Sequence, residues 1–208
     1  MKNLTLSILA LFAVTITSAQ ITTIEIGDKA PFSDYKLRNI DGSTVSIKNI
    51  TGENGALVIF TCNNCPFVIG RGEEIEGWEG RYNGIISLAA QNEIGSILVN
   101  SNEAKRNGDD NITAMKNKAH DMGYLAPYVV DEESKLANAF GARTTPHVFL
   151  FNSDLELIYT GAIDDNVNSS EEVENHYLID AIERHSVGKR IKKNTTAPLG
   201  CSIKRVQH

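Results

Sequence analysis

The 208-residue sequence has few cysteines, no excess of positive charge and no long hydrophobic run after its first twenty residues. Three cysteines are too few for a small scaffold that depends on several disulfide bridges. The formal net charge of −6 argues against nucleic-acid binding, which needs a basic surface. Hydrophobic residues nevertheless make up 41% of the chain, which is enough for a folded core. The sequence therefore indicates a globular protein whose function depends on a few special residues.

The N-terminus is typical of a secretory signal peptide. Lys2 precedes a mostly apolar run over residues 4–16, and the small residues 17–19 follow it. This run is shorter than the about 20 residues that a membrane-spanning helix needs, and an uncleaved anchor is the alternative. We therefore expect a signal peptide at residues 1–19, a periplasmic or otherwise secreted protein, and no membrane span after cleavage.

Hydrophobic periodicity predicts alternating strands and helices along the rest of the chain. The strands are expected at residues 35–37, 44–47, 56–60, 94–99, 128–130, 147–151 and 157–160, and the helices at 66–85, 112–122, 134–140 and 171–185. Four glycines should kink or break the first helix, because each weakens a helix by up to ~1 kcal/mol. The order predicts an α/β domain at residues 20–187, with a central mixed sheet, flanking helices and an N-terminal β-hairpin extension. The basic C-terminal tail, residues 188–208, is expected to be a solvated end.

Cys62 and Cys65 form a C-x-x-C pair between a buried strand and a helix that begins near Pro66. The helix N-terminus favours a negative group, so the pKa of Cys62 is expected to fall. Two intervening residues allow Cys65 to attack a mixed disulfide at Cys62. Half of a zinc site, a structural disulfide and two unrelated thiols are the alternatives. A zinc site lacks a second C-x-x-C, since Cys201 is the remaining cysteine. The strand–helix context favours a redox pair.

Five short segments carry a family resemblance. They are Gly27-Asp28-Lys29-Ala30-Pro31 with Phe32, Cys62-Asn63-Asn64-Cys65-Pro66, Thr145-Pro146, Asp164-Asp165-Asn166 and Gly200-Cys201-Ser202-Ile203-Lys204. Over about residues 25–205 the chain resembles the thioredoxin-like superfamily, and more closely its exported redoxins of the AhpC/TSA type.

The resemblance implies a thioredoxin-like fold and a redox-active Cys62–Cys65 disulfide, with Cys62 as the exposed nucleophile and Cys65 as the buried resolving thiol. It further implies that Pro146 is cis and that Thr145, with Asn63 and Asn64, contacts an extended substrate. No cofactor and no metal are implied. The expected partners are protein thiols or disulfides and a redox partner still to be identified, and a monomer is expected.

The chain departs from the family at several positions. Thioredoxins have a buried Asp where this chain has Ala56, so the base that deprotonates Cys65 stays open. They have Gly-Pro where this chain has Asn63-Asn64. Peroxiredoxins would have Pro at Val58 and Thr at Cys62. We therefore predict an exported thiol–disulfide oxidoreductase, with a thiol peroxidase that uses Cys65 and a non-catalytic binding module as alternatives.

Three other features have two interpretations each. His147 either adds charge near the dithiol or packs in the interior. Asp109-Asp110-Asn111 and Asp164-Asp165-Asn166 either bind calcium or form turns and helix caps, and their spacing favours the second. Cys201 either anchors the tail through burial, helped by Leu199 and Ile203, or exchanges disulfides with Cys62 or a partner.

Overall fold

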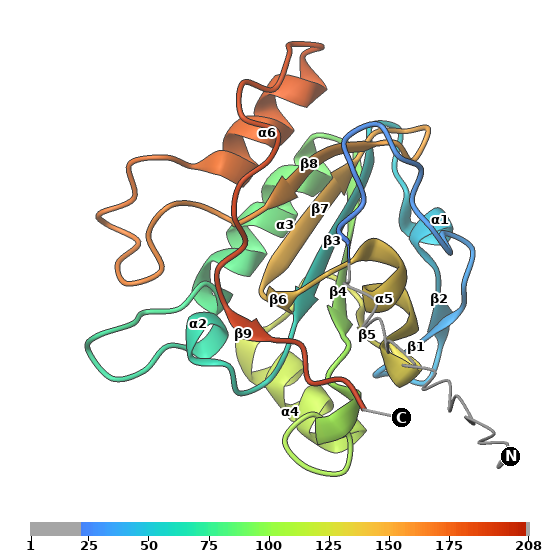
Figure 1. Cartoon of the computed structure of the whole chain (residues 1–208), viewed down its shortest axis with the longest axis vertical. Helices are drawn as coiled ribbons and strands as arrows, with labels where there is room; N and C mark the ends of the chain where they lie inside the picture. Colours follow the sequence, from blue (N-terminus) through green and yellow to red (C-terminus); the bar gives the residue numbers. More distant parts are fainter. Residues whose placement is uncertain (1–21, 207–208) are drawn as a thin grey trace, which may run out of the picture.

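The computed structural model describes residues 22–206 (Figure 1), so the predicted signal peptide lies outside the described residues. Within this range no helix is long and apolar enough to cross a membrane. The described residues form a mixed sheet between two layers of helices, with the C-terminal segment running across the molecule to β9.

Seven strands form the central sheet in the order β2-β1-β5-β4-β3-β7-β8. Their bounds are β1 Leu37–Asn39, β2 Thr44–Val45, β3 Gly55–Thr61, β4 Ile94–Asn100, β5 Tyr128–Val130, β7 His147–Phe151 and β8 Leu157–Gly161. The strands β3, β4 and β5 run parallel, whereas β7 lies antiparallel to β3 and β8 lies antiparallel to β7. The mixed central sheet of the prediction is confirmed. The predicted N-terminal hairpin forms, and β1 joins the sheet by pairing with β5.

The central strand β3 is buried along its whole length because helices cover both faces of the sheet. Successive side chains of a strand point to opposite faces. Leu57 and Ile59 accordingly pack into one core, and Val58 and Phe60 pack into the other. A run of apolar residues without polar alternation is what such a two-sided strand requires.

The helices divide between these two faces. Their bounds are α1 Ile47–Ile50, α2 Pro66–Ile69, α3 Tyr82–Gln91, α4 Ile112–Met122, α5 Lys135–Phe140 and α6 Tyr177–Ser186, with short 3-10 turns η1 Glu79–Arg81, η2 Glu103–Lys105 and η3 Glu132–Ser134. Buried residues of α2, α3, α4 and α6 belong to the core of Leu57, and those of α1 and α5 belong to the core of Phe60. The sheet therefore holds the end of β3 rigidly between two packed layers.

Two predicted helices differ from the structure. The helix that begins at Pro66 ends after Ile69, because Gly70 takes a φ of 86° that lies outside the helical region. The predicted break is thus confirmed, although the segment between α2 and η1 is a loop. The last helix begins at Tyr177 and not at Glu171. The residues before Tyr177 form a loop, in which the Glu174 N–H donates to the Asp165 carboxylate at 3.1 Å.

The C-terminal tail does not end in solvent as expected, although most of its basic side chains are exposed. The tail crosses the molecule from α6 (red in Figure 1) and forms β9, Cys201–Ser202. The strand β9 pairs antiparallel with β6, Thr144–Thr145, so that Cys201 lies opposite Thr145. Ile203 beyond it is buried in the core of Phe60. The last described residues therefore belong to the folded domain.

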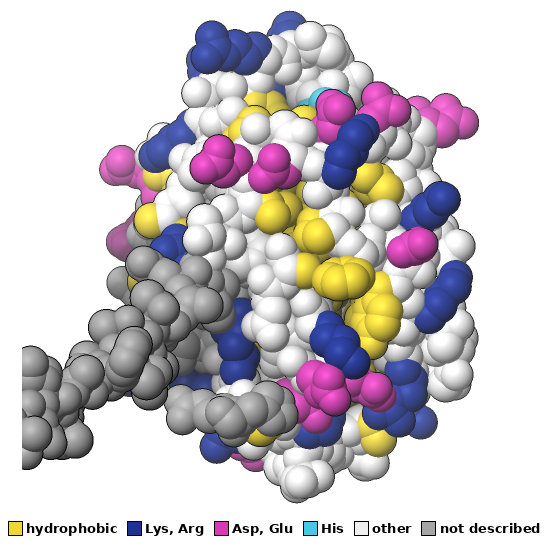
Figure 2. Space-filling view, turned by 45° about the vertical axis from the view of Figure 1, so that its right-hand side comes forward, with side chains coloured by type: hydrophobic (Ala, Val, Ile, Leu, Met, Phe, Trp, Pro, Cys, Tyr) yellow, Lys and Arg dark blue, Asp and Glu magenta, His cyan; other side chains and the backbone are white. Residues whose placement is uncertain are grey.

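Side chains of both charge signs are interspersed on the face shown in Figure 2, around a narrow band of hydrophobic side chains. No broad basic surface is visible on this face. This distribution is consistent with the acidic net charge of the sequence.

Candidate redox site

The C-x-x-C pair lies at the end of β3, the central strand. Cys62 follows Thr61, the last residue of this strand, and Cys65 is the N-cap residue of α2. Pro66 takes the first helical position, where its missing N–H group costs no hydrogen bond. Both cysteines are buried, with 1% and 2% of their surface exposed. The expected exposure of Cys62 is therefore wrong for the protein in this conformation.

Thr145, which belongs to β6 and is distant in sequence, lies against both cysteines. The peptide bond between Thr145 and Pro146 is cis, as predicted. The Thr145 hydroxyl lies 3.1 Å from the Cys62 sulfur, and the Thr145 carbonyl oxygen lies 3.2 Å from the Cys65 sulfur, where it accepts from Cys65 in its protonated form. The structure therefore brings Cys62, Cys65, Thr145 and Pro146 together, as the sequence predicted.

The pKa values of the two cysteines are shifted in the reverse of the predicted order. Hydrogen bonding from the Cys62 thiol, with further help from Cys201, lowers the pKa of Cys65 to about 5 although burial opposes this. The contact with Cys65, together with burial, raises the pKa of Cys62. The prediction of a lowered Cys62 pKa is thus wrong. Cys65 is the N-cap residue of the four-residue helix α2 and its side chain makes no capping hydrogen bond, so the contacts with the other thiols lower its pKa.

Cys201 adds a third thiol to this pair. Its backbone N–H donates a hydrogen bond to the Cys65 sulfur at 3.4 Å, and the two thiols also interact. Burial and the neighbouring Cys65 raise the pKa of Cys201 to about 11. Cys201 is partly exposed and carries no disulfide. The tail therefore places its cysteine beside Cys65 and not beside Cys62.

A small pocket of about 160 Å³ opens over the three thiols. It is lined by Cys62, Asn64, Cys65, Asn102, Lys105, Thr145, Cys201, Ser202 and Lys204. Two of its lining side chains, Lys105 and Lys204, are cationic, and both are exposed. The pocket thus offers a positively charged entrance to a site where a thiolate forms.

Asn63 does not face this pocket, contrary to the prediction that it contacts substrate. Its backbone N–H binds the Asp110 carboxylate at 2.9 Å, and its side-chain amide donates to the Asp109 carbonyl at 2.7 Å. Its side-chain oxygen accepts from the Tyr128 hydroxyl at 2.8 Å. Asn63 is therefore a structural residue of the loop. Asn64 is exposed, lines the pocket and remains available to a substrate.

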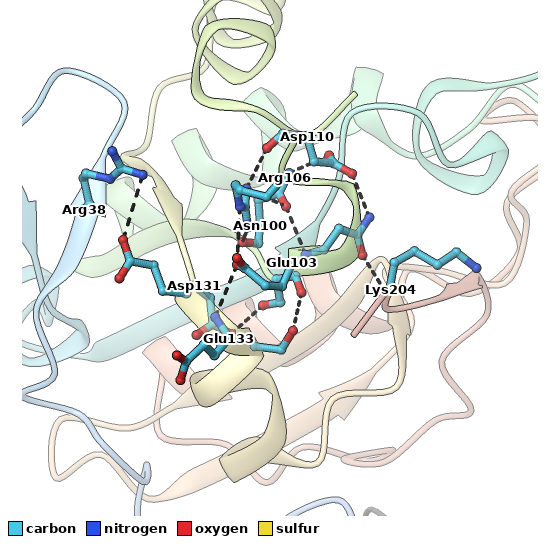
Figure 3. A network of polar contacts seen from close by, with 12 residues as sticks. Arg38, Asn100, Glu103, Arg106, Asp110, Asp131, Glu133 and Lys204 are labelled. Atoms are coloured by element: carbon cyan, nitrogen blue, oxygen red, sulfur yellow. Dashed lines mark hydrogen bonds and ion pairs between the residues drawn. The ribbon is translucent and has the colours of Figure 1, made fainter. Parts of the chain in front are cut away.

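Asp110 is the buried carboxylate of the site and is part of the network in Figure 3. Besides Asn63, the side chains of Asn100 and Asn102 donate to it at 2.7 Å and 3.0 Å. Asn102 in turn accepts from the backbone N–H of Lys204 at 2.9 Å. One carboxylate therefore connects the cysteine loop to the C-terminal tail.

The sequence interpretation missed this role of Asp110. Asp109-Asp110-Asn111 was expected to form a turn or a helix cap, and Asn111 indeed caps α4 by accepting from two backbone N–H groups. The signal that could have found the network is the polar residue Asn100 at the carboxyl end of the buried strand β4. Polar residues at that edge of parallel strands converge next to the end of β3.

His147 takes the packing role of its two interpretations. It is buried, and burial together with Arg143 lowers the pKa of its imidazole to about 3, so the ring is neutral. Its Nδ1 accepts from the Arg143 backbone N–H at 3.2 Å. His147 therefore adds no positive charge beside the dithiol.

Asp164-Asp165-Asn166 forms a side-chain turn, as expected, in which the Asn166 N–H donates to the Asp164 carboxylate at 3.0 Å. Asp164 accepts hydrogen bonds from Trp78 at 2.7 Å and from Arg81 at 2.6 Å. Among residues 22–206, no group of three or more His, Cys, Asp or Glu side chains is arranged to hold a metal ion.

The AhpC/TSA family model matches residues 26–160 of the chain. Among solved structures, a conserved protein of Geobacillus kaustophilus is similar at 26% identity and a TM-score of 0.78, covering 88% of this chain and 94% of that one. A hypothetical protein of Sinorhizobium meliloti 1021 is similar at 24% identity and a TM-score of 0.79, covering 90% and 98%. Peroxiredoxin Q of Xanthomonas campestris is similar at 13% identity and a TM-score of 0.55, covering 78% and 97%. A search of curated proteins gave no match.

Proposed function

Because this chain belongs to the AhpC/TSA family, we propose that it is a thiol–disulfide oxidoreductase that cycles Cys62 and Cys65 between dithiol and disulfide. The observation that carries the proposal is the placement of both sulfurs against Thr145, beside the cis Pro146. Two interacting thiols of unequal acidity suit this exchange, since one attacks as a thiolate and the other completes the reaction.

The exchange balances without a cofactor. The thiolate attacks one sulfur of a substrate disulfide, forms a mixed disulfide and releases the other substrate sulfur as a thiol. The second cysteine then attacks the mixed disulfide, which releases the remaining substrate thiol and leaves Cys62 and Cys65 joined. The substrate gains two electrons and the pair loses two. Run backwards, the same steps oxidise a dithiol substrate.

A turnover assay with a protein disulfide tests this proposal. Reduced full-length protein should reduce insulin in the presence of dithiothreitol, and Cys62→Ser and Cys65→Ser should each abolish turnover. Ser43→Ala, in the β1–β2 turn, is the matched control and should retain the rate. Equal rates in all four proteins would refute the proposal. Equilibration in glutathione buffers would then give the reduction potential of the pair, and hence its direction in the compartment.

A thiol peroxidase is the second candidate, and the lowered pKa of Cys65 favours it. The Cys65 thiolate would attack a peroxide oxygen, releasing water or an alcohol and leaving a sulfenic acid. Cys62 would then condense with this acid, giving the disulfide and water. Hydrogen peroxide consumption that depends on Cys65 and exceeds the insulin rate would establish this activity in place of disulfide exchange.

Export, the substrate class and the oligomeric state are part of the same proposal. We expect residues 1–19 to be removed on secretion, so that the mature protein works in a periplasmic or other extracytoplasmic compartment on protein thiols or disulfides. N-terminal sequencing of the protein from fractionated cells tests this, and gel filtration tests the expected monomer. A non-catalytic binding module predicts the same free-thiol count with and without reductant and no Cys-dependent turnover.

A further inference from the structure

We propose that Cys201 is a third redox thiol, which takes Cys65 into a second disulfide and thereby holds the C-terminal tail over the active site. The inference rests on the proposed function for the supply of the first disulfide. Three structural features support it: the placement of Cys201 beside Cys65, the β6–β9 pairing and the hydrogen bonds that anchor the tail.

Backbone pairing between β9 and β6, and not random motion of the tail, places Cys201 beside the active-site cysteines. The pairing of β9 with β6 sets Cys201 opposite Thr145, the residue whose carbonyl and hydroxyl contact the two active-site cysteines. A Cβ atom on Gly200 would lie 2.2 Å from the Thr145 carbonyl oxygen, so the residue before Cys201 must be glycine for this approach. The tail thus lies directly on the strand that precedes Pro146.

Contacts on the C-terminal side of Cys201 fix the tail further. Ile203 is buried, and its backbone N–H binds the Arg143 carbonyl at 3.0 Å. The Lys204 carbonyl accepts from the Ala104 N–H at 2.9 Å, and the Lys204 N–H binds Asn102. Arg205 donates to Asn138 at 2.6 Å. A segment held at consecutive positions presents its thiol to one neighbour.

The tail occupies a place that a substrate would need. An extended peptide gains affinity by pairing its backbone with a free strand edge. In this structure β9 already pairs with β6, and Cys201 stands next to Cys65 where the cysteine of such a peptide would lie. A substrate therefore has to displace β9, and a covalent bond from Cys201 would prevent that displacement.

The proposed step is an internal exchange. Starting from the Cys62–Cys65 disulfide, the Cys201 thiolate attacks the Cys65 sulfur, the Cys65–Cys201 bond forms and the Cys62–Cys65 bond breaks. Cys62 leaves as a thiolate and takes up the proton that Cys201 lost, so no electrons enter or leave the protein. Burial and the neighbouring Cys65 raise the pKa of Cys201 in the dithiol state, and the part due to charge on Cys65 is absent once Cys65 is in a disulfide. The reduced protein contains no disulfide for Cys201 to attack, so the step occurs after oxidation of the pair.

Two single variants and the wild-type protein test the step. Reduced full-length C62S and C65S are each treated with one equivalent of diamide, quenched with acid and N-ethylmaleimide, and digested for disulfide mapping. We expect C62S to form the Cys65–Cys201 bond with a mass loss of about 2 Da for the two hydrogens removed, and C65S to form no internal disulfide. In oxidised wild-type protein, we expect part of the population to contain Cys65–Cys201 with Cys62 alkylated.

The matched control moves the thiol by one residue. In the C62S background, C201S together with S202C keeps the β9 backbone but turns the thiol to the opposite face of the strand. We expect no crosslink to Cys65. A crosslink in this control, or in C65S, would overturn the inference by showing that the tail is too mobile to select Cys65.

The wild-type map separates this inference from the proposed function. Wild-type protein that contains the Cys62–Cys65 disulfide alone would refute the role of Cys201 and leave the proposed function intact. Wild-type protein in which neither disulfide forms would refute both.

Discussion

At the scale of single residues, the chemistry of the site depends on which sulfur receives hydrogen bonds. Cys65 accepts from the Cys62 thiol and from the thiol and backbone N–H of Cys201, and its pKa falls to about 5. The contact with Cys65, together with burial, raises the pKa of Cys62, and the hydrogen bond with the Thr145 hydroxyl opposes this rise. The hydrogen bond from Cys62 therefore contributes most to the lowered pKa of Cys65, and the donors of the tail at Cys201 lower it further.

Selective alkylation tests this assignment. In the reduced protein at pH 7, iodoacetamide should modify Cys65 faster than Cys62, because the lowered pKa makes Cys65 a thiolate and both cysteines are equally buried. Mass spectrometry of digests of the wild-type protein, sampled over time, measures the two rates with both cysteines in place. Faster modification of Cys62 in the wild-type protein would restore the order expected from the sequence.

A second residue-scale prediction concerns Asp110, which accepts from three amide donors in a fully buried position. Asp110→Asn places an amide donor against these donors, and each unpaired buried group costs about 1–3 kcal/mol. We expect a loss of unfolding free energy in this range by urea denaturation. The pKa of Cys62 should also fall, because the charge of Asp110 contributes to raising it.

Asp109→Asn is the matched control, since Asp109 is exposed and binds Asn64 through its side chain. This variant should keep the wild-type unfolding free energy within about 0.5 kcal/mol. Equal losses in both variants would show that the carboxylate of Asp110 is not what holds the cysteine loop.

At the scale of elements, the β6–β9 pair controls access to the cysteines. Gly200→Ala should disrupt this pair, because the new Cβ would lie 2.2 Å from the Thr145 carbonyl oxygen, and backbone there cannot move aside. We expect faster hydrogen exchange over residues 198–206 and a higher pKa of Cys65, which loses the donors of Cys201. Gly84→Ala, in helix α3, is the control, since an added Cβ there meets no neighbour and the backbone has no positive φ. Unchanged exchange in Gly200→Ala would contradict the prediction.

The elements that the sequence predicted well carry local signals at both ends. The helix α4 has its predicted bounds, because Asn111 caps its start and Gly123 ends it in the left-handed conformation. The start of α6 was misplaced because side-chain hydrogen bonds to the backbone before Tyr177 compete with helix formation. Asp165 accepts from the Glu174 N–H and from the Asn175 side chain, so side-chain hydrogen bonds hold this part of the predicted helix in a loop.

The candidate site also has a part that the sequence predicts and a part that it does not. The C-x-x-C pair and its strand–helix context could be predicted from neighbouring residues, and the family resemblance implied the role of the Thr145–Pro146 step. The contacts of Asp110 with Asn63 and of Cys201 with Cys65 join segments far apart in the sequence, and no local pattern indicates them. The tail in particular has the polar, basic composition of a solvent-exposed segment. Its pairing with β6 depends on Gly200 and on the buried Ile203.

At the scale of the whole molecule, the central sheet forms one side of the site and the C-terminal tail covers the other. The central strand β3 is buried on both faces and ends at Cys62, so the sheet fixes one side of the site. The tail fixes the other side through a two-residue strand and side-chain contacts. Short segments of this kind open at lower free energy than the central strands. Reaction with a large substrate therefore requires the tail, and not the sheet, to move.

The lowered pKa of Cys65 also couples the stability of the whole molecule to pH. A thiol whose folded pKa lies at about 5, against an ordinary value of 9.0, stabilises the folded state above the ordinary value. This contribution is lost as the pH falls from about 9 to about 5. The pKa values of Cys62 and Cys201 are raised, so these two thiols stay protonated in this window and add no slope. Between pH 5 and 9, Cys65 is therefore the thiol that sets the pH dependence.

Urea denaturation of the reduced protein at pH 5.5, 6.5, 7.5 and 8.5 measures this coupling. The difference in unfolding free energy between wild type and Cys65→Ser should grow with pH, by at most about 1.4 kcal/mol per pH unit for one proton. Taking the difference removes His147, whose lowered pKa affects both proteins alike. A difference that is constant across the series would mean that Cys65 titrates alike in the folded and unfolded chain. The donors from Cys62 and Cys201 would then not stabilise a thiolate in the folded protein.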